Sequence, residues 1–190
     1  MSKNITREPK GDGTYHIRAD FVLADTPEKL FPKSNLKEAT GHCRKEVAKA
    51  DKQGYRDELD KQVKDRIDRG VLRELTEEEK SNLPNKAHNF ATYSVVFNPR
   101  SESTPVRLVT NTSALNNGMS ISTAERYPKQ SLNSILAVLW AFSILPTPSI
   151  GDLSKAYNQI KISERVSYLR MMVYQFKGED FFRLFLSLVI

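Results

Sequence analysis

The sequence predicts an α+β fold, in which helices and strands occupy separate stretches of the chain. Three observations support this class. Residues 35–69 carry apolar side chains at three- and four-residue steps, the spacing of amphipathic helices. Residues 93–97 and 106–110 are β-prone runs joined by a turn-rich segment, which indicates a hairpin. Residues 168–176 place apolar side chains at alternate positions, as a strand does.

The N-terminal residues 1–14 are polar and contain glycine, so we expect a flexible N-terminus. Residues 15–23 alternate well enough for a short strand. Pro27 and Pro32 then bracket a loop.

Two helices are expected after this loop. Ser34 or Asn35 can cap the first helix, and Gly54 interrupts it before the second begins near Tyr55. Gly70 follows the end of the second helix, where a glycine is favoured. The apolar stripes consist of Leu36, Ala39, Cys43, Val47, Ala50, Leu59, Val63 and Ile67. The opposite face of the second helix is interpreted as a solvated charged surface of Arg56, Asp57, Asp60, Lys61, Lys64, Asp65 and Asp68.

The connecting segments are expected to be irregular. Residues 74–90 are interpreted as a connector and residues 111–130 as a polar loop. Between this loop and the next predicted strand, Ser131 can cap a nearly all-apolar helix at 132–142, with Trp140 in its packed face. We interpret this stretch as a buried helix, because a membrane span needs about 20 apolar residues.

One acid stands out in the second half of the chain. Asp152 ends a predicted strand at 148–153 and is the only acid between Glu125 and Glu164; residues 157–162 then return toward helix or turn. A carboxylate in such a place can bind magnesium ions that activate a hydroxyl and stabilise a leaving pyrophosphate. A lone acid after a strand equally serves as a helix cap or turn former.

The composition favours a polyanionic partner and excludes some kinds of site. The net charge is +6, and residues 91–190 hold 10 Lys/Arg against 6 Asp/Glu. The single cysteine, Cys43, permits no internal disulfide and no thiolate metal cluster, and we expect a packed thiol. His16, His42 and His88 lie too far apart in sequence for zinc-ligand spacing.

The chain shows no secretion signal, since no basic-then-apolar leader opens it. Its longest apolar stretch is interrupted by polar residues and is followed by prolines. We therefore expect an intracellular protein of the cytoplasm or nucleus, not secreted and without a membrane partner.

Six features between about residues 12 and 176 follow one another in a specific order. They are Gly13-Thr-Tyr-His-Ile, Pro32-Lys-Ser-Asn-Leu-Lys-Glu-Ala, Gly70-Val-Leu-Arg-Glu-Leu, Tyr93-Ser-Val-Val-Phe with Val106-Arg-Leu-Val-Thr-Asn-Thr-Ser-Ala, Ser131-Leu-Asn133, and Gly151-Asp-Leu-Ser-Lys-Ala-Tyr157. Together they resemble the reverse transcriptase of BEL/Pao-type retrotransposons. The resemblance implies an N-terminal extension and fingers at 15–130, and a partial, antiparallel palm at 131–180.

The resemblance also implies roles for single residues. Asp152 would be the first catalytic metal ligand, with the Leu153 carbonyl as a further oxygen ligand for magnesium. Tyr157 would select the sugar of the incoming nucleotide, and Arg107 would contact its triphosphate. The implied partners are an RNA or DNA template–primer and deoxynucleoside triphosphates. Read alone, Arg107 equally suits an edge-strand charge, and Tyr157 a packed aromatic.

The chain departs from this family in two ways. Asn111 stands where the family tends to have an acid. The sequence also lacks the Asp-Asp pair of the second catalytic element, and the only acids after Asp152 are Glu164, Glu179 and Asp180. We therefore expect a fragment of an RNA-directed DNA polymerase that is inactive alone.

The remaining expectations concern association. Residues 181–190 are interpreted as an apolar, truncated tail, and the unpaired strand edges of an incomplete palm predict self-association. Two alternatives to a polymerase fragment stay open. One is a non-catalytic nucleic-acid-binding remnant. The other is a protein-interaction module on the helices, built on Leu59, Val63 and Ile67.

Overall fold

The computed structural model describes residues 5–9, 11, 13, 15–102, 104–125, 134–144 and 160–189. These residues form helices and mostly antiparallel sheets, which confirms the α+β class. The helices are α1 (Pro27–Leu30), α2 (Leu36–Lys52), α3 (Arg56–Asp68), α4 (Glu77–Asn82), the 3-10 helix η1 (Leu83–Asn85), α5 (Ile121–Ala124), α6 (Ile135–Ile144) and α7 (Glu164–Leu169). The strands are β1 (Ile5–Pro9), β2 (Tyr15–Ala19), β3 (Leu72–Glu74), β4 (Thr92–Phe97), β5 (Val106–Asn111), β6 (Ile160–Ile162), β7 (Met172–Tyr174) and β8 (Arg183–Ser187).

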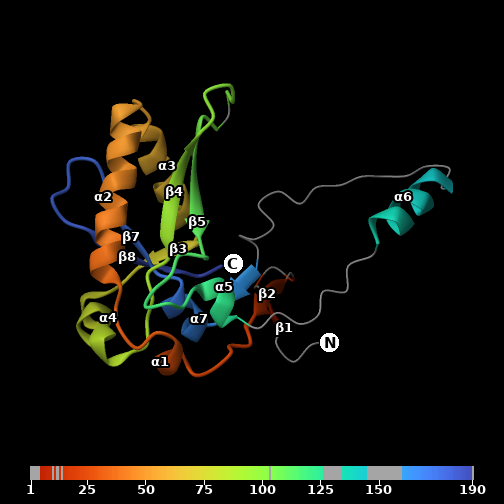
Figure 1. Ribbon diagram of the computed structural model, residues 1–190, viewed down its shortest axis with the longest axis horizontal. Helices are drawn as coiled ribbons and strands as arrows, with labels where there is room; N and C mark the ends of the chain where they lie inside the picture. The colour runs from red at the N-terminus through yellow and green to blue at the C-terminus, as the bar shows by residue number, and fades with distance from the viewer. Residues whose placement is uncertain are drawn as a thin grey trace.

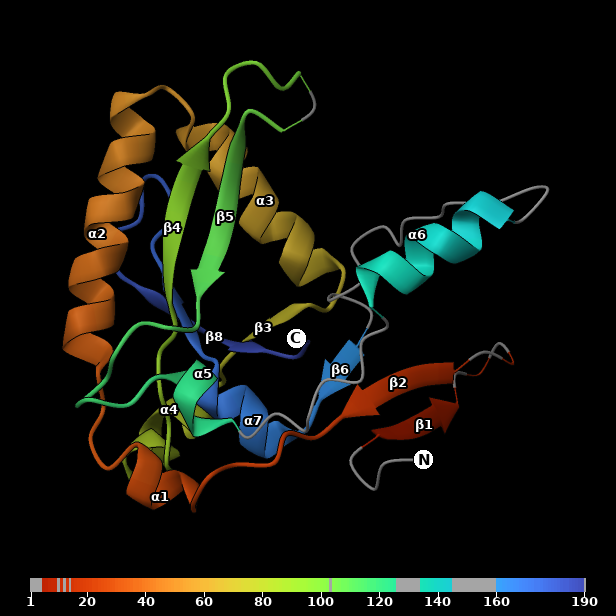
Figure 2. The same ribbon diagram turned by 45° about the vertical axis from the view of Figure 1, so that its right-hand side comes forward.

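The two long helices lie along the β4–β5 hairpin: α2 is beside β4 (Figure 1), and the turned view shows α3 beside β5 (Figure 2). α2 packs against β4 and β7, and α3 packs against β5 and β3. The predicted apolar stripes supply this packing, since Cys43, Leu59 and Val63 have no exposed surface. The helices and the hairpin therefore form where the sequence pattern predicts them.

Both long helices end at a glycine in the left-handed region. Gly54 has φ +74° and Gly70 has φ +67°, a conformation that a Cβ atom disfavours. After α3, the Gly70 N–H donates to the Ile67 carbonyl at 2.9 Å and the Val71 N–H donates to the Arg66 carbonyl at 2.8 Å. This pair of bonds is a Schellman motif, and it confirms the predicted end at Gly70.

The second sheet has the strand order β3-β8-β7, with every pair antiparallel. Its middle strand, β8, lies in the stretch 181–190 that the sequence suggested as a tail. Phe185 and Leu186 of β8 are buried in the main core. The end of the described chain is thus a central part of the sheet.

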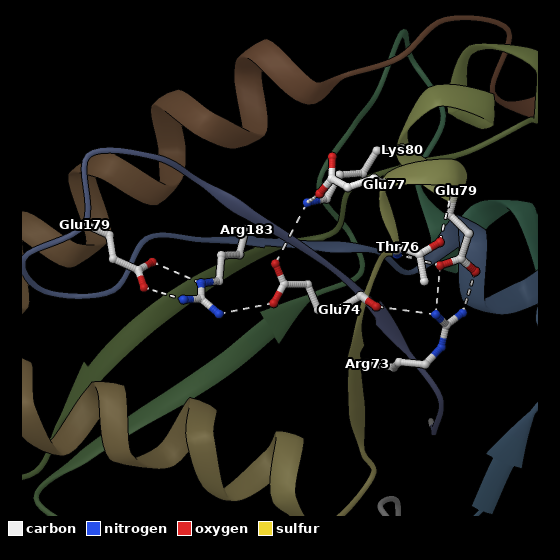
Figure 3. A network of polar contacts seen from close by, with 8 residues as sticks. All are labelled: Arg73, Glu74, Thr76, Glu77, Glu79, Lys80, Glu179 and Arg183. Carbon is white, nitrogen blue, oxygen red and sulfur yellow. Dashed lines mark hydrogen bonds and ion pairs between the residues drawn. The ribbon is translucent and has the colours of Figure 1, made fainter.

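Ion pairs tie this strand to the neighbouring elements (Figure 3). Arg183 at the start of β8 pairs with Glu179 at 2.5 Å and with Glu74 of β3 at 3.2 Å. On the other side of β3, Arg73 donates two hydrogen bonds to the carboxylate of Glu79 in α4, at 2.7 and 2.8 Å. The two groups of contacts therefore join β8, β3 and α4.

The third sheet has the order β1-β2-β6. β1 lies within the N-terminal stretch 1–14 that was expected to be flexible, and it pairs antiparallel with β2. β6 pairs parallel with β2, with Ile17 opposite Ile160. The expectation of helix or turn through residue 162 was therefore wrong for β6, because its backbone finds a strand partner from the distant N-terminus.

Short helices form in segments interpreted as irregular. The connector 74–90 contains α4 and η1; Thr76 caps α4 by accepting a bond from the Glu79 N–H, while the Glu79 side chain accepts from the Thr76 N–H. This capping box stabilises a helix too short for a visible apolar period. The loop 111–130 contains α5, capped by Ser120.

The predicted strand at 168–176 was wrong in its first part. α7 continues to Leu169, and only Met172–Tyr174 is a strand. Val166, Ser167, Tyr168 and Leu169 are all buried, so the second half of this short helix resembles a buried strand in sequence.

The prediction that the apolar helix is buried was also wrong. α6 stands apart from the rest of the molecule in both views (Figure 1, Figure 2), and Trp140 is 68% exposed rather than packed. The proposed cap Ser131 lies outside the described residues. Among the helices that the structure describes, none is long and apolar enough to cross a membrane.

The charged face of α3 is not wholly solvated, because Arg56 and Asp60 are buried. Asp60 accepts hydrogen bonds from Arg56 Nε at 3.2 Å, from the Tyr174 hydroxyl at 2.6 Å and from the Lys177 N–H at 3.0 Å. These contacts join α3 to β7 and the turn after it. Buried charges are tolerated when they are paired in this way.

Candidate nucleic-acid interface

The β4–β5 hairpin has one buried and one open face. Tyr93, Val95, Val106 and Leu108 point into the core, because side chains alternate along a strand. The outward positions pair across the strands as Thr92 with Asn111, Ser94 with Val109, and Val96 with Arg107. Val96 is 46% exposed and Val109 is 48% exposed. This outward set is called the outer hairpin face.

Side chains of α2 hold the open edge of β4. His42 Nε2 donates to the Tyr93 carbonyl at 2.6 Å. The carboxylate of Glu46 accepts a bond from the Val95 N–H at 2.7 Å and pairs with Lys49. His42 and Glu46 lie one helical turn apart, so both reach the same strand.

Side chains of α3 hold the open edge of β5 in the same manner. Gln62 donates to the Val106 carbonyl at 2.5 Å and accepts from the Leu108 N–H at 3.4 Å. Arg66, four residues further on, donates to the Leu108 carbonyl at 2.8 Å. The hairpin is thus fixed along both edges by polar side chains.

These contacts leave the hairpin little edge for pairing with another strand. An edge strand associates when its N–H and C=O groups lack partners. The edges of β4 and β5 have partners in α2 and α3. The outer hairpin face remains open.

Arg107 is the cation of the outer hairpin face. Its side chain is exposed, and its Nη2 donates to Thr104 Oγ1 at 3.2 Å. Among the residues that the structure describes, no acid pairs with Arg107. The guanidinium therefore keeps donors available for an anionic oxygen such as phosphate.

A cavity of about 510 Å³ lies at the base of the hairpin. Its apolar lining includes Leu72, Met171 and Met172, while Thr110 and Thr112 contribute hydroxyls. The lining is completed by Arg66, Val71, Ala91, Tyr93, Leu108, Val109, Arg170, Ser187 and Val189. Val109 belongs to both the cavity and the outer hairpin face, so the two surfaces are continuous.

Two guanidinium groups border this cavity. Burial lowers the pKa of Arg66, and the nearby Arg69 acts in the same direction. Arg170 pairs with the buried carboxylate of Glu125 at 2.6 Å and lies over the Phe21 ring at 4.9 Å from its centroid. Arg66 therefore places a positive charge beside a largely apolar cavity, whereas the charge of Arg170 is neutralised by Glu125.

Asp152, Leu153 and Tyr157 lie outside the described residues, as does the Ser131-Leu-Asn133 segment. Of the predicted site residues, the structure places only Arg107. Within the described ranges, no group of three or more His, Cys, Asp or Glu side chains could hold a metal ion.

The sequence analysis did not identify Arg66 and Arg170 as residues near the outer hairpin face. It also did not identify the contacts of His42, Glu46 and Gln62 with the hairpin. A weak signal exists for four of these five residues. Gln62 and Arg66 are four residues apart, as are His42 and Glu46, so each pair shares one helix face. Nothing in the sequence marks these faces as facing a strand edge.

Comparisons of the chain with models of known protein families, with curated proteins and with solved structures found no match.

Proposed function

We propose that the chain is a fragment of an RNA-directed DNA polymerase of a retroelement, and that its outer hairpin face contacts a template–primer and incoming nucleotides. The observation that carries this proposal is Arg107, an exposed guanidinium without an acidic partner among the described residues. It lies on a hairpin held along both edges by α2 and α3. A fixed cation beside exposed β-branched side chains suits the phosphates and sugars of a nucleic acid.

Positive charge continues away from Arg107 toward the base of the hairpin. Arg66 borders the cavity that adjoins Val109, and the chain has a net charge of +6. Phosphate contacts by such groups release counterions and make binding dependent on salt. This distribution supports a surface that follows a nucleic-acid backbone.

The family resemblance supplies the polymerase part of the proposal. Magnesium would be held by Asp152 and the Leu153 carbonyl, with Tyr157 beside the nucleotide sugar. The described residues offer no carboxylate set for that ion, and the sequence contains no Asp-Asp pair. We therefore assign no catalytic step to this chain and expect no primer extension by it alone.

The test measures template–primer binding by fluorescence anisotropy at two salt concentrations. Arg107→Ala should weaken binding by about 5- to 10-fold at low salt. The slope of log affinity against log salt concentration should fall by about one, the value for one lost phosphate contact. Arg165→Ala on α7 removes the same charge from an arginine that is also exposed and should change the affinity less than about 2-fold. Equal effects of the two substitutions would contradict a role for the outer hairpin face.

A non-catalytic nucleic-acid-binding remnant is the second candidate, and the same face favours it. Asp152→Asn tests whether the chain keeps polymerase activity, which both candidates exclude. Binding that survives this change, without primer extension by either chain, is expected for an inactive fragment and for a remnant. Magnesium-dependent extension that disappears in Asp152→Asn would show an active polymerase and overturn the expected inactivity.

The interaction-module alternative has less structural support. Leu59 and Val63 have no exposed surface, and Ile67 is partly buried against the same core. A partner could reach this stripe only if α3 left the core, which would expose the apolar side chains that stabilise the fold.

A further inference from the structure

The solvent side of α2 carries a row of cations. The helix buries its other side, which is formed by Ala39, Cys43, Glu46, Val47 and Ala50. Opposite to these, six residues follow one another at three- and four-residue steps, which places them in one row along the helix. This row is called the basic stripe and consists of Lys37, Gly41, Arg44, Lys45, Ala48 and Lys52. Its four cationic side chains are all exposed.

The cations of the basic stripe have no acidic partner among the residues that the structure describes. The three acids of α2 lie outside the stripe. Glu46 is buried and pairs with Lys49. Asp51 pairs with Arg56 of α3. Glu38 lies in the first turn, where the helix dipole favours an acid. The stripe therefore concentrates positive charge that the fold does not neutralise.

Arg44 is held in position without an acidic partner. Its guanidinium lies 5.1 Å from the centroid of the Phe182 ring, in the loop between β7 and β8 that passes beside α2 (Figure 1). An arginine stacked on an aromatic face keeps its N–H donors available for oxygen acceptors. Arg44 is thus oriented before any partner binds.

Gly41 lies inside the helix, in the middle of the basic stripe. A helix interior favours alanine over glycine. Within the described structure, a Cβ atom added at Gly41 would meet nothing within 4 Å, so the packing of the chain gives no reason for a glycine. Ala48 lies two turns further along. The two small residues leave the helix backbone open between the cations, which lets a partner approach closely.

We propose that the basic stripe binds the phosphate backbone of a duplex nucleic acid, as a contact surface separate from the outer hairpin face. From Lys37 to Lys52 the stripe extends over about 22 Å, at the helical rise of about 1.5 Å per residue. A duplex carries about one phosphate charge per 1.7 Å of its axis, so a straight row of cations meets several phosphates at once. Nucleic acid as the class of partner rests on the proposed function, whereas the surface is argued from α2 alone.

The residue types of the stripe favour a duplex over other anionic partners. A single strand is held by stacking its bases on aromatic side chains, and the stripe contains none. A helix that lies on a membrane inserts its apolar side, whereas the apolar side of α2 is buried in the core. The stripe also contains no Asn or Gln to read base edges, so we expect binding that does not depend on base sequence.

The test measures binding of a short blunt DNA duplex by fluorescence anisotropy over a series of salt concentrations. Lys45→Gln with Lys52→Gln should weaken binding at least about 10-fold at low salt. The slope of log affinity against log salt concentration should fall by about two, one for each lost phosphate contact. Thermal melting checks that the variant keeps the fold.

The matched control is Lys29→Gln with Lys61→Gln. It changes the net charge by the same amount at two exposed lysines outside the stripe, in α1 and α3. This variant should weaken duplex binding less than about 3-fold, because only the overall charge has changed. Equal losses in the two variants would contradict a contact at the stripe.

Gly41→Gln tests the close approach, because it adds a side chain without changing the charge. Glutamine favours a helix more than glycine does, so the melting temperature should rise. The added side chain should nevertheless hold the duplex away from the helix and weaken binding. Unchanged duplex affinity would contradict the proposed approach to the helix backbone.

Lysine acetylation, measured by mass spectrometry, locates the contact directly. With the duplex bound, Lys45 and Lys52 should react several-fold more slowly than in the free chain. Lys29 and Lys61 should react at unchanged rates. Protection of both pairs, or of neither, would contradict binding at the basic stripe.

The results separate the basic stripe from the outer hairpin face. If Lys45→Gln with Lys52→Gln weakens duplex binding and Arg107→Ala does not, the stripe is supported and the hairpin face is not; the reverse result supports the hairpin face alone. No duplex binding at low salt, or tighter binding of a single strand, overturns the stripe. Binding to anionic phospholipid vesicles that needs Lys45 and Lys52, without duplex binding, assigns the stripe to a membrane surface and also overturns the proposal.

Discussion

Glu46 lies where α2 meets the open edge of β4, and its side chain is almost fully buried. Burial acts to raise the pKa of this carboxyl group. The hydrogen bonds from Lys49 and from the Val95 N–H, together with the positive charge of Lys49, outweigh it and lower the pKa. At neutral pH, Glu46 is therefore an ionised acceptor for a strand edge.

Glu46→Ala should lower the free energy of unfolding by about 1–3 kcal/mol, because it leaves the buried Val95 N–H without a partner. Glu46→Gln keeps an acceptor oxygen at the same position and should cost less. Urea denaturation of the two variants measures the difference. Equal losses would mean that the hydrogen bond to β4 contributes little.

Glu79 couples stability to pH. Two hydrogen bonds from Arg73 are the main cause that lowers its pKa from 4.5 to about 2, with further bonds from Thr76. Its stabilising effect is complete above about pH 4.5 and is lost as the pH falls through about 2. Because solvent screens this pair, we expect a loss of only about 0.5–1 kcal/mol. Denaturation between pH 5 and pH 2 should show a smaller decline for Glu79→Gln than for the unmodified chain.

Residue roles were only partly predictable. Arg107 was identified from a family resemblance, and the structure places it exposed on the hairpin. Arg56 and Asp60 carry charges typical of a solvated face, yet both are buried. Their partners, Tyr174 and the Lys177 N–H, come from more than a hundred residues away, so no local pattern indicates the contact.

Among elements, the long helices were the most predictable. Their apolar stripes extend over several turns, and glycines mark their ends. The left-handed backbone conformation of Gly70 would be unfavourable for any residue with a Cβ atom.

Gly70→Ala should therefore destabilise the chain by about 1 kcal/mol. Gly41→Ala is the matched control, because Gly41 lies inside α2 with nothing within 4 Å of an added Cβ. That change should stabilise the chain by about 0.5–1 kcal/mol, since alanine favours a helix interior. Thermal melting should move the two variants in opposite directions; shifts of the same sign would contradict the assigned conformations.

Short elements were the least predictable. α4 depends on a capping box, and β6 depends on pairing with β2. α7 is a helix whose last four residues are all buried. Elements of three to six residues cannot display a period clearly, so their neighbours decide their conformation.

At the scale of the whole molecule, the C-terminal stretch closes the core. β8 lies between β3 and β7, and its contacts join residues far apart in the chain. Phe185→Ala should lower the free energy of unfolding by about 3–5 kcal/mol, because Phe185 is fully buried. Phe181→Ala, at a side chain that is 57% exposed, should cost under about 1 kcal/mol. Denaturant unfolding measures both, and a small loss at Phe185 would mean that β8 is peripheral.

The sequence by itself determined the α+β class, the two long helices, their glycine ends and the β4–β5 hairpin. These features follow from local rules, namely the helical period, the strand period and the conformational freedom of glycine. The tertiary structure alone decided that His42, Glu46, Gln62 and Arg66 hold the hairpin edges, that β8 is central and that α6 is exposed. Each of these depends on which distant segment lies alongside, and packing determines this where local preference does not.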